Sequence, residues 1–160
     1  MTVSTYSRSQ IILHWLIALA IAFNYLFSDG VSHAYRSFLR SGQAVSDIGA
    51  TVHVYVGLAV IALVALRLVL RWVRGVPPAP ATESELMRRV GEWTHLALYV
   101  LMLGVPVLGA VAWYMGITAV GQLHSLAANL ILLVAGLHAA AALFHHYILR
   151  DGLLLRMVRF

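Results

Sequence analysis

Four long stretches of apolar residues limit what this sequence can fold into, and the last of them carries no charged side chain. About 20 apolar residues cross a hydrocarbon core of about 30 Å as an α-helix. A lipid-exposed backbone must form a helix or a closed barrel, and the stretches show no strand-like alternation. The sequence therefore predicts an all-α membrane protein, a bundle of four transmembrane helices over about 11–27, 48–70, 92–113 and 122–149.

The composition supports this class. Hydrophobic residues make up 61% of the 160 residues and charged residues only 11%, against about 25% charged in a soluble domain. The absence of cysteine excludes disulfides, iron–sulfur clusters and covalent c-type haem. Residues 1–160 read as one domain. Ala18-Leu19-Ala20 resembles a signal-peptide cleavage site, but the apolar stretch continues to Phe27, so we interpret it as a retained helix.

The arginines predict the orientation in the membrane. Nine of the eleven positive residues lie at the N-terminus, in 67–92 or at the C-terminus, and only Arg36 and Arg40 lie on the other side. Positive residues favour the cytoplasmic side. We therefore expect a multi-pass protein of the bacterial inner membrane with both termini in the cytoplasm. No motif indicates nucleic-acid binding.

The connections are short. Residues 28–47 predict a polar outer loop that contains His33, with some helix around 34–40. The Pro-rich stretch 75–86, GVPPAPATESEL, predicts an extended cytoplasmic connector, with Thr82 or Ser84 capping the next helix. Pro106 is expected to kink the third transmembrane helix.

Four histidines fall at two depths of this bundle. His14 lies near the cytoplasmic end of the first helix and His53 near the outer end of the second. On the fourth helix, His124 lies near the outer end, and His138 lies about 21 Å deeper on nearly the same face. His14 and His138 thus share an inner level, and His53 and His124 an outer one.

Two histidines per level, from different helices, match the two axial ligands of a haem iron in an apolar bundle. Zinc requires three or four ligands, and no carboxylate or cysteine joins either level. Histidines alone leave copper open. Buried ionisable residues are costly in a membrane and indicate function. A single haem, or histidines that only join helices by hydrogen bonds, are the alternatives.

Several segments resemble the bacterial cytochrome b561 family over nearly the whole chain. They are SRSQIILHW (7–15), HVYVGLAVIALVALRLVLR (53–71), THLALYVLMLGVPVLG (94–109) and the stretch from Ala128 to Met157, which contains GLHAAAALFHH. The resemblance implies a four-helix membrane cytochrome with two b-type haems that exchanges electrons with ubiquinone, in a family that includes superoxide oxidases. It implies the same ligands, His14, His53, His124 and His138. It also places His95 and His145 near a quinone pocket.

This chain differs from the family at the Pro-rich connector, because members of the family carry lysines there and this connector has none. Arg74, Arg88 and Arg89 are the candidates for replacing them as a basic site for an anionic substrate. Histidine can also hydrogen-bond a quinone carbonyl and supply a proton, although His95 and His145 could instead be interfacial. His146 is expected to be solvated or to face the lipid headgroups, and His33 to be a loop residue rather than a ligand.

Arginines near the two levels are candidate partners of the haem propionates, because guanidinium groups form bidentate bonds with carboxylates. Arg8, Arg67 and Arg71 flank the inner level, and Arg36 and Arg40 the outer one. The alternative is that they are topology signals that reach lipid phosphates.

Together these features predict an oxidoreductase, a diheme b-type cytochrome that passes single electrons between a small donor such as superoxide and ubiquinone, with lipid and quinone as partners. Two alternatives remain. One is a haem b anchor subunit of a dehydrogenase or hydrogenase, which would receive electrons from a donor protein. The other is a non-redox transporter or channel with structural or proton-carrying histidines.

Overall fold

The chain forms a bundle of long helices. The computed structural model describes residues 5–42, 47–78 and 83–158, and within these ranges all regular structure is helical. Four helical stretches are long and apolar enough to cross a membrane, which confirms the predicted four-helix transmembrane fold. The elements are α1 (Arg8–Leu26), α2 (Asp29–Ser41), α3 (Ile48–Arg74), α4 (Glu85–Met115), α5 (Thr118–Phe144), the π-helical turn η1 (His145–Leu149) and the 3-10 turn η2 (Leu154–Met157).

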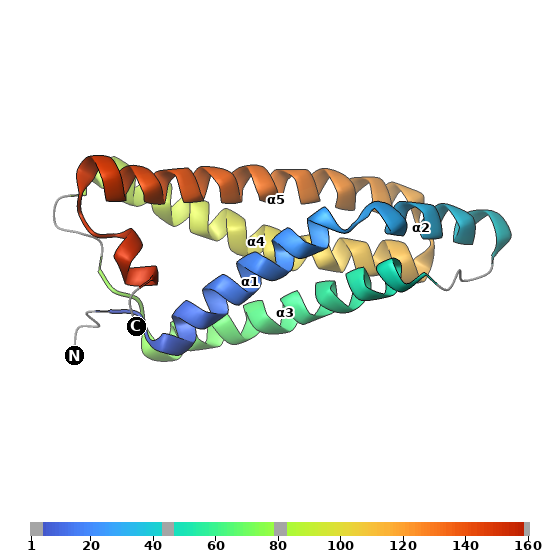
Figure 1. Ribbon diagram of the computed structural model, residues 1–160, viewed down its shortest axis with the longest axis horizontal. Helices are drawn as coiled ribbons and strands as arrows, with labels where there is room; N and C mark the ends of the chain where they lie inside the picture. Colours follow the sequence, from blue (N-terminus) through green and yellow to red (C-terminus); the bar gives the residue numbers. More distant parts are fainter. Residues whose placement is uncertain (1–4, 43–46, 79–82, 159–160) are drawn as a thin grey trace.

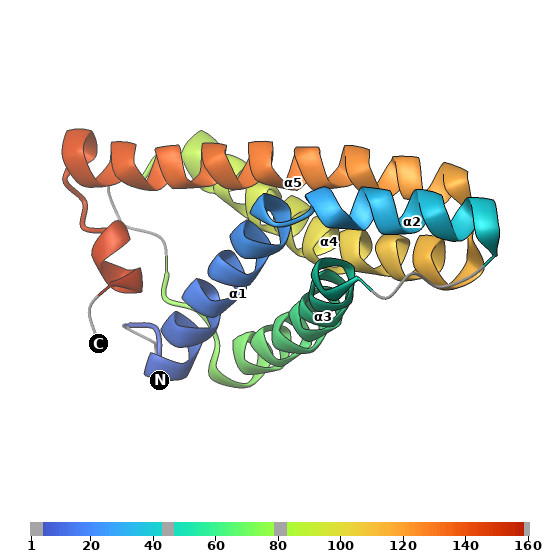
Figure 2. The same ribbon diagram turned by 45° about the vertical axis from the view of Figure 1, so that its right-hand side comes forward.

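The helices form two packed pairs that are joined through α3 and α4. Helix α5 packs along α4, α1 packs on α3, and α3 packs on α4. Both termini lie at the same end of the bundle, and α2 lies at the opposite end (Figures 1 and 2). We call these the terminal end and the α2 end. They correspond to the ends that the arginine distribution predicts to be inner and outer.

Two helices extend beyond their apolar stretches. Helix α3 continues to Arg74, and α4 begins at Glu85 rather than near residue 92. The early start of α4 has a local cause, because the Ser84 hydroxyl caps the helix by accepting a hydrogen bond from the Met87 amide at 3.3 Å. This confirms Ser84 as the cap. Thr82, the other candidate, lies outside the described residues.

The predicted loop at 28–47 is largely a helix, which corrects the expectation of only partial helix there. Helix α2 ends at Ser41 and is capped by Gly42, whose backbone is left-handed, with φ 68°. Its sequence, DGVSHAYRSFLRS, mixes polar and apolar residues on opposite faces instead of forming an apolar run, so a search for long apolar stretches passes over it. His33 consequently lies on a helix.

A small buried core separates the two histidine levels. Ile17, Val60 and Val64 are at most 4% exposed and pack together. Ile17 is one helical turn from His14, and Val60 is two turns from His53, so this apolar cluster lies between the inner and outer levels. Large apolar side chains such as Trp72, 87% exposed, cover the outside of the bundle, as expected for a surface that faces lipid.

The last described residues, 150–158, turn back across the terminal end and are called the C-terminal segment below. The chain reverses at Arg150, whose φ of 53° is left-handed. Two long-range hydrogen bonds then hold the segment. The Trp15 indole donates to the Met157 carbonyl at 2.7 Å, and Arg156 donates to the Pro78 carbonyl at 2.6 Å.

Candidate haem sites

The four histidines selected by depth meet in two pairs. The ring centres of His53 and His124 are 6.1 Å apart at the α2 end, and those of His14 and His138 are 6.3 Å apart at the terminal end. Two metal–nitrogen bonds of about 2 Å each, plus the distance from each nitrogen to its ring centre, give roughly 6 Å. Both separations therefore fit one metal ion held between two imidazoles. We call these the outer pair and the inner pair.

Backbone hydrogen bonds orient both rings of the outer pair. His124 Nδ1 lies 2.8 Å from the Val105 carbonyl, and His53 Nδ1 lies 3.2 Å from the Asn24 carbonyl. Because a carbonyl can only accept, each Nδ1 carries the proton and each Nε2 is left free to bind a metal. Asn24 completes the arrangement by donating its side-chain amide to the His53 carbonyl at 3.1 Å. This reciprocal pair fixes α1 against α3 at the level of the ligand.

A cavity of about 620 Å³ surrounds the outer pair. This volume is within the range of about 300–1,000 Å³ typical of cofactor and ligand sites. Gly109 borders it and approaches the His124 ring so closely that an added Cβ would lie 2.9 Å from Cε1. The lining is mainly apolar, with polar residues that include Tyr25, Ser32, Tyr35, Arg36, Gln122 and Ser125. The site therefore suits a large, flat, mostly apolar cofactor with a few polar groups.

The inner pair has a third histidine beside it. The ring centre of His95, on α4, is 5.1 Å from that of His138. This is shorter than the separation across a metal ion and corresponds to direct contact between rings. Among the described residues, no three His, Asp or Glu side chains gather in a geometry that could hold a metal ion. The arrangement therefore favours pairs of axial ligands over a zinc site with three or four ligands.

The three arginines expected at the inner level lie in different surroundings. Arg67 donates to the Gln10 carbonyl at 2.8 Å. Arg71 borders a small cavity with Tyr6, and burial raises the pKa of Tyr6 although Arg71 and Arg67 oppose the change. Arg8 is exposed. Arg67, which is half-buried, and Arg71, which is exposed but borders this small cavity, therefore remain the candidates.

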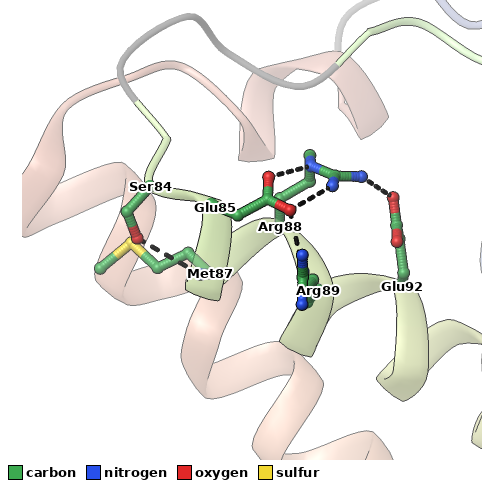
Figure 3. Close-up of polar contacts among 6 residues, drawn as sticks. All are labelled: Ser84, Glu85, Met87, Arg88, Arg89 and Glu92. Carbon is green, nitrogen blue, oxygen red and sulfur yellow. Dashed lines mark hydrogen bonds and ion pairs between the residues drawn. The ribbon is translucent and has the colours of Figure 1, made fainter.

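Arg88 and Arg89 are engaged in ion pairs at the start of α4 (Figure 3). Arg88 contacts Glu85 at 2.8 Å and Glu92 at 2.5 Å, and Arg89 contacts Glu85 at 2.8 Å. Two arginines and two glutamates balance in charge, so this cluster offers little attraction for an anion. Arg74 donates to the Ser9 hydroxyl at 2.7 Å, which leaves its charge unbalanced.

The two histidines that the resemblance places near a quinone pocket, His95 and His145, have different surroundings in the structure. His95 lies beside His138, whereas His145 is 8% exposed and its Nδ1 donates to the Asp151 carboxylate at 2.5 Å. His145 therefore has a structural partner that the sequence did not reveal. His146 is less buried than His145.

The two arginines expected at the outer level, Arg36 and Arg40, are both exposed on α2.

Three residues of these sites escaped the sequence analysis. Asn24 was detectable, because a polar amide inside an apolar transmembrane stretch indicates a specific partner. Gly109 and Tyr35 gave no such signal, since their importance depends on which helices face them.

Four apolar helices that carry facing pairs of histidines define a class of protein, the membrane cytochromes that bind haem inside a helical bundle. The model of the prokaryotic cytochrome b561 family matches residues 5–160, so the chain belongs to that family. This confirms the resemblance seen in the sequence. The chain is accordingly a multi-pass bacterial membrane protein, a cytochrome that binds haem b and takes part in electron transfer. A non-redox channel or transporter is not supported.

Named relatives cover almost the full chain. Cytochrome b562 of Cereibacter sphaeroides is 44% identical over 96% of this chain and 95% of its own length. A probable superoxide oxidase of Yersinia pestis is 28% identical over 96% of this chain and 95% of its own. Cytochrome b561 homolog 1 of Escherichia coli K12 is also 28% identical, over 96% of both chains.

Proposed function

We propose that the protein holds two haems b, one between His53 and His124 and one between His14 and His138, and passes single electrons between them. The observation that carries this proposal is the pair of ring separations, 6.1 Å and 6.3 Å, each of which fits one iron ion. Bound haem iron supplies a reversible one-electron carrier. The chain supplies the free Nε2 atoms, the hydrogen bonds that orient the outer rings, and an apolar interior that excludes water.

The ligand assignment is tested by replacing each histidine singly. His53→Ala or His124→Ala should remove the outer haem and keep the inner one, and His14→Ala or His138→Ala should do the opposite. Pyridine haemochrome stoichiometry gives the haem content of each purified variant, and His33→Ala, on the exposed side of α2, is the control. Two haems retained in all four ligand variants would overturn the assignment.

For the substrates, we infer that superoxide or another small donor reduces the haem at the α2 end and that ubiquinone is reduced at the terminal end. Two superoxide anions each lose one electron and become two O₂ molecules. One ubiquinone takes up these two electrons and two protons and becomes ubiquinol. The similarity to a probable superoxide oxidase supports superoxide as the donor, and the charge balance around Arg88 supports a donor site away from the connector. Arg36 and Arg40 are the cations of the α2 end.

At the terminal end, His95 is the favoured contact for the quinone. Its ring touches that of the proposed ligand His138, and it lies at the surface of the bundle, where a lipid-soluble molecule has access. An imidazole can donate a hydrogen bond to a quinone carbonyl and deliver a proton to it. His145 remains a second candidate through its Nε2 atom, because only its Nδ1 is occupied by Asp151.

The quinone site is tested by stopped-flow reoxidation of the reduced protein with a soluble ubiquinone analogue. His95→Ala and His145→Ala should both keep two haems. Loss of one hydrogen bond of about 1 kcal/mol should slow electron transfer to the quinone roughly fivefold. His146→Ala is the control and should leave the rate unchanged. Unaltered rates in the His95 and His145 variants would contradict a quinone pocket at this end.

A further inference from the structure

The outer cavity contains a polar atom that the proposed ligands do not explain. The hydroxyl of Tyr35, on α2, is buried and has no hydrogen-bond partner among the described residues, and Tyr35 lines the cavity together with His53 and His124. A buried hydroxyl without a partner is costly, and such groups in a native protein indicate a missing ligand or water. The Tyr35 hydroxyl is therefore available to bind a polar group of a molecule in this cavity.

Contacts with two transmembrane helices hold Tyr35 in this position. Its ring stacks on that of Trp113 of α4, with ring centres 6.3 Å apart and planes 25° apart. On α5, Gly121 allows a close approach, because a Cβ there would lie 3.4 Å from Tyr35 Cε1. The phenol is thus positioned by packing, and its hydroxyl is left available.

Two other polar donors of the cavity are already engaged, while the buried side-chain oxygen of Asn24, which can only accept a hydrogen bond, has no partner among the described residues. The hydroxyl of Tyr25 donates to Asn129 Oδ1 at 2.9 Å, and the amide of Asn24 donates to the His53 carbonyl. Arg36 also lines the cavity, next to Tyr35 in the sequence. A phenolic hydroxyl and a guanidinium are both hydrogen-bond donors at neutral pH, and together they suit a carboxylate.

We propose that Tyr35 and Arg36 bind the propionate carboxylates of the outer haem, so that this haem lies with its propionates toward α2. The propionates are the hydrogen-bonding groups at the edge of an otherwise apolar macrocycle, and this edge of the cavity carries the free donors. The proposal rests on the proposed ligands His53 and His124. It makes α2 a part of the cofactor site as well as a connection between α1 and α3.

The test is a spectroelectrochemical titration of the purified holoprotein with Tyr35→Phe, which keeps the stacked ring and removes only the hydroxyl. The outer haem is identified as the component that disappears in His53→Ala. Its midpoint potential should fall in Tyr35→Phe, because a propionate that loses a donor places more negative charge near the iron and stabilises the ferric state. The inner haem should keep its potential. The resonance Raman band for propionate bending should shift in the same variant.

Tyr25→Phe is the matched control, since it removes a hydroxyl of the same cavity that already has a partner. It should change neither the outer potential nor the propionate band. Arg36→Gln, at an exposed position of α2, should lower the outer potential as Tyr35→Phe does. The proposal is overturned if the outer potential is unchanged in Arg36→Gln, or if Tyr25→Phe shifts it as much as Tyr35→Phe does. If Tyr35→Phe loses haem, the Arg36→Gln result decides.

This outcome is separable from a failure of the ligand assignment. If His53→Ala retains both haems, the proposed outer ligands are wrong, whatever the Tyr35 variant shows. If His53→Ala loses one haem and Tyr35→Phe changes nothing, only the propionate proposal fails.

Discussion

Gly109 is the residue that lets α4 and the ring of His124 approach each other. An alanine Cβ at this position would lie 2.9 Å from His124 Cε1 and 3.0 Å from Nδ1, well inside the usual carbon contact distance of about 3.5 Å. Nδ1 is also the atom that donates to the Val105 carbonyl. A side chain at 109 would therefore disturb both the place of the ring and its orienting hydrogen bond.

We expect Gly109→Ala to lower the occupancy of the outer haem while the inner haem stays bound. The displaced ring loses its alignment with His53, and a loss of about 1–3 kcal/mol would weaken binding roughly 5- to 150-fold. Haem content after dialysis against apomyoglobin measures this retention. Gly104→Ala is the control on the same helix, because a Cβ there meets nothing within 4 Å. Equal haem loss in both variants would contradict this role of Gly109.

At the residue scale, spacing along helices was sufficient to select the four histidines that pair. The contacts that orient them were not predictable, because they depend on backbone carbonyls of other helices, as with Val105 and Asn24. The pairing of His145 with Asp151 was hidden for a different reason. Six residues along a regular α-helix point in directions roughly 120° apart, and only the π-helical turn and the left-handed Arg150 bring the two side chains together.

At the scale of elements, polar contacts help to hold the C-terminal segment across the terminal end. Asp151 binds His145 and also accepts from the Leu153 amide at 3.0 Å. Burial disfavours the carboxylate, but the hydrogen bonds from His145 and Leu153 outweigh it and lower the pKa of Asp151. A carboxyl with a lowered pKa stabilises the folded form above its unfolded pKa of about 3.9, and this contribution is lost as the pH falls through the folded pKa.

We therefore expect Asp151→Ala to loosen the C-terminal segment at neutral pH. The variant leaves His145 buried without its partner, a loss of about 1–3 kcal/mol, so amide exchange should quicken roughly 5- to 150-fold. Hydrogen exchange of peptides covering 150–158 measures this. The difference from the unaltered protein should shrink only as the pH falls below about 3.9 and through the lowered pKa of the native carboxyl. Glu92→Ala, which removes an exposed ion pair elsewhere, should not change exchange in the segment.

The elements were predictable to the extent that hydrophobicity defines them. Long apolar stretches located α1, α3, α4 and α5, because a membrane admits few other structures. Helix α2 and the start of α4 lie outside the apolar region, and they depend instead on amphipathic packing, the Ser84 cap and the ion pairs of Glu85. Such local terms are each worth about 1 kcal/mol or less and are difficult to weigh from a sequence.

At the scale of the whole molecule, both termini lie at one end of the bundle (Figure 1). Because nine of the eleven arginines belong to that end, a reporter enzyme fused after Phe160 should be active in the cytoplasm. Alkaline phosphatase, active only outside the cytoplasm, and a fluorescent protein, active inside, give opposite readouts of the same fusion point. A fusion in the 43–46 connection is the control and should give the reverse pattern. Periplasmic activity after Phe160 would invert the orientation.

The apolar cluster of Ile17, Val60 and Val64, which lies between the two histidine levels, affects electrons and protons differently. An electron can pass between carriers on either side of a dry layer, whereas a proton requires a chain of polar groups, and the cluster offers none. The two histidine levels are about 21 Å apart in a hydrocarbon core of about 30 Å, so in the proposed function each electron that moves inward would cross most of the insulating layer. A resting potential that is negative inside opposes this movement by up to about 2.3 kcal/mol per 100 mV. Protons taken up by quinone at the inner face would not cancel it. Each turnover would therefore charge the membrane like a capacitor, and a polarised membrane would slow the protein that charges it.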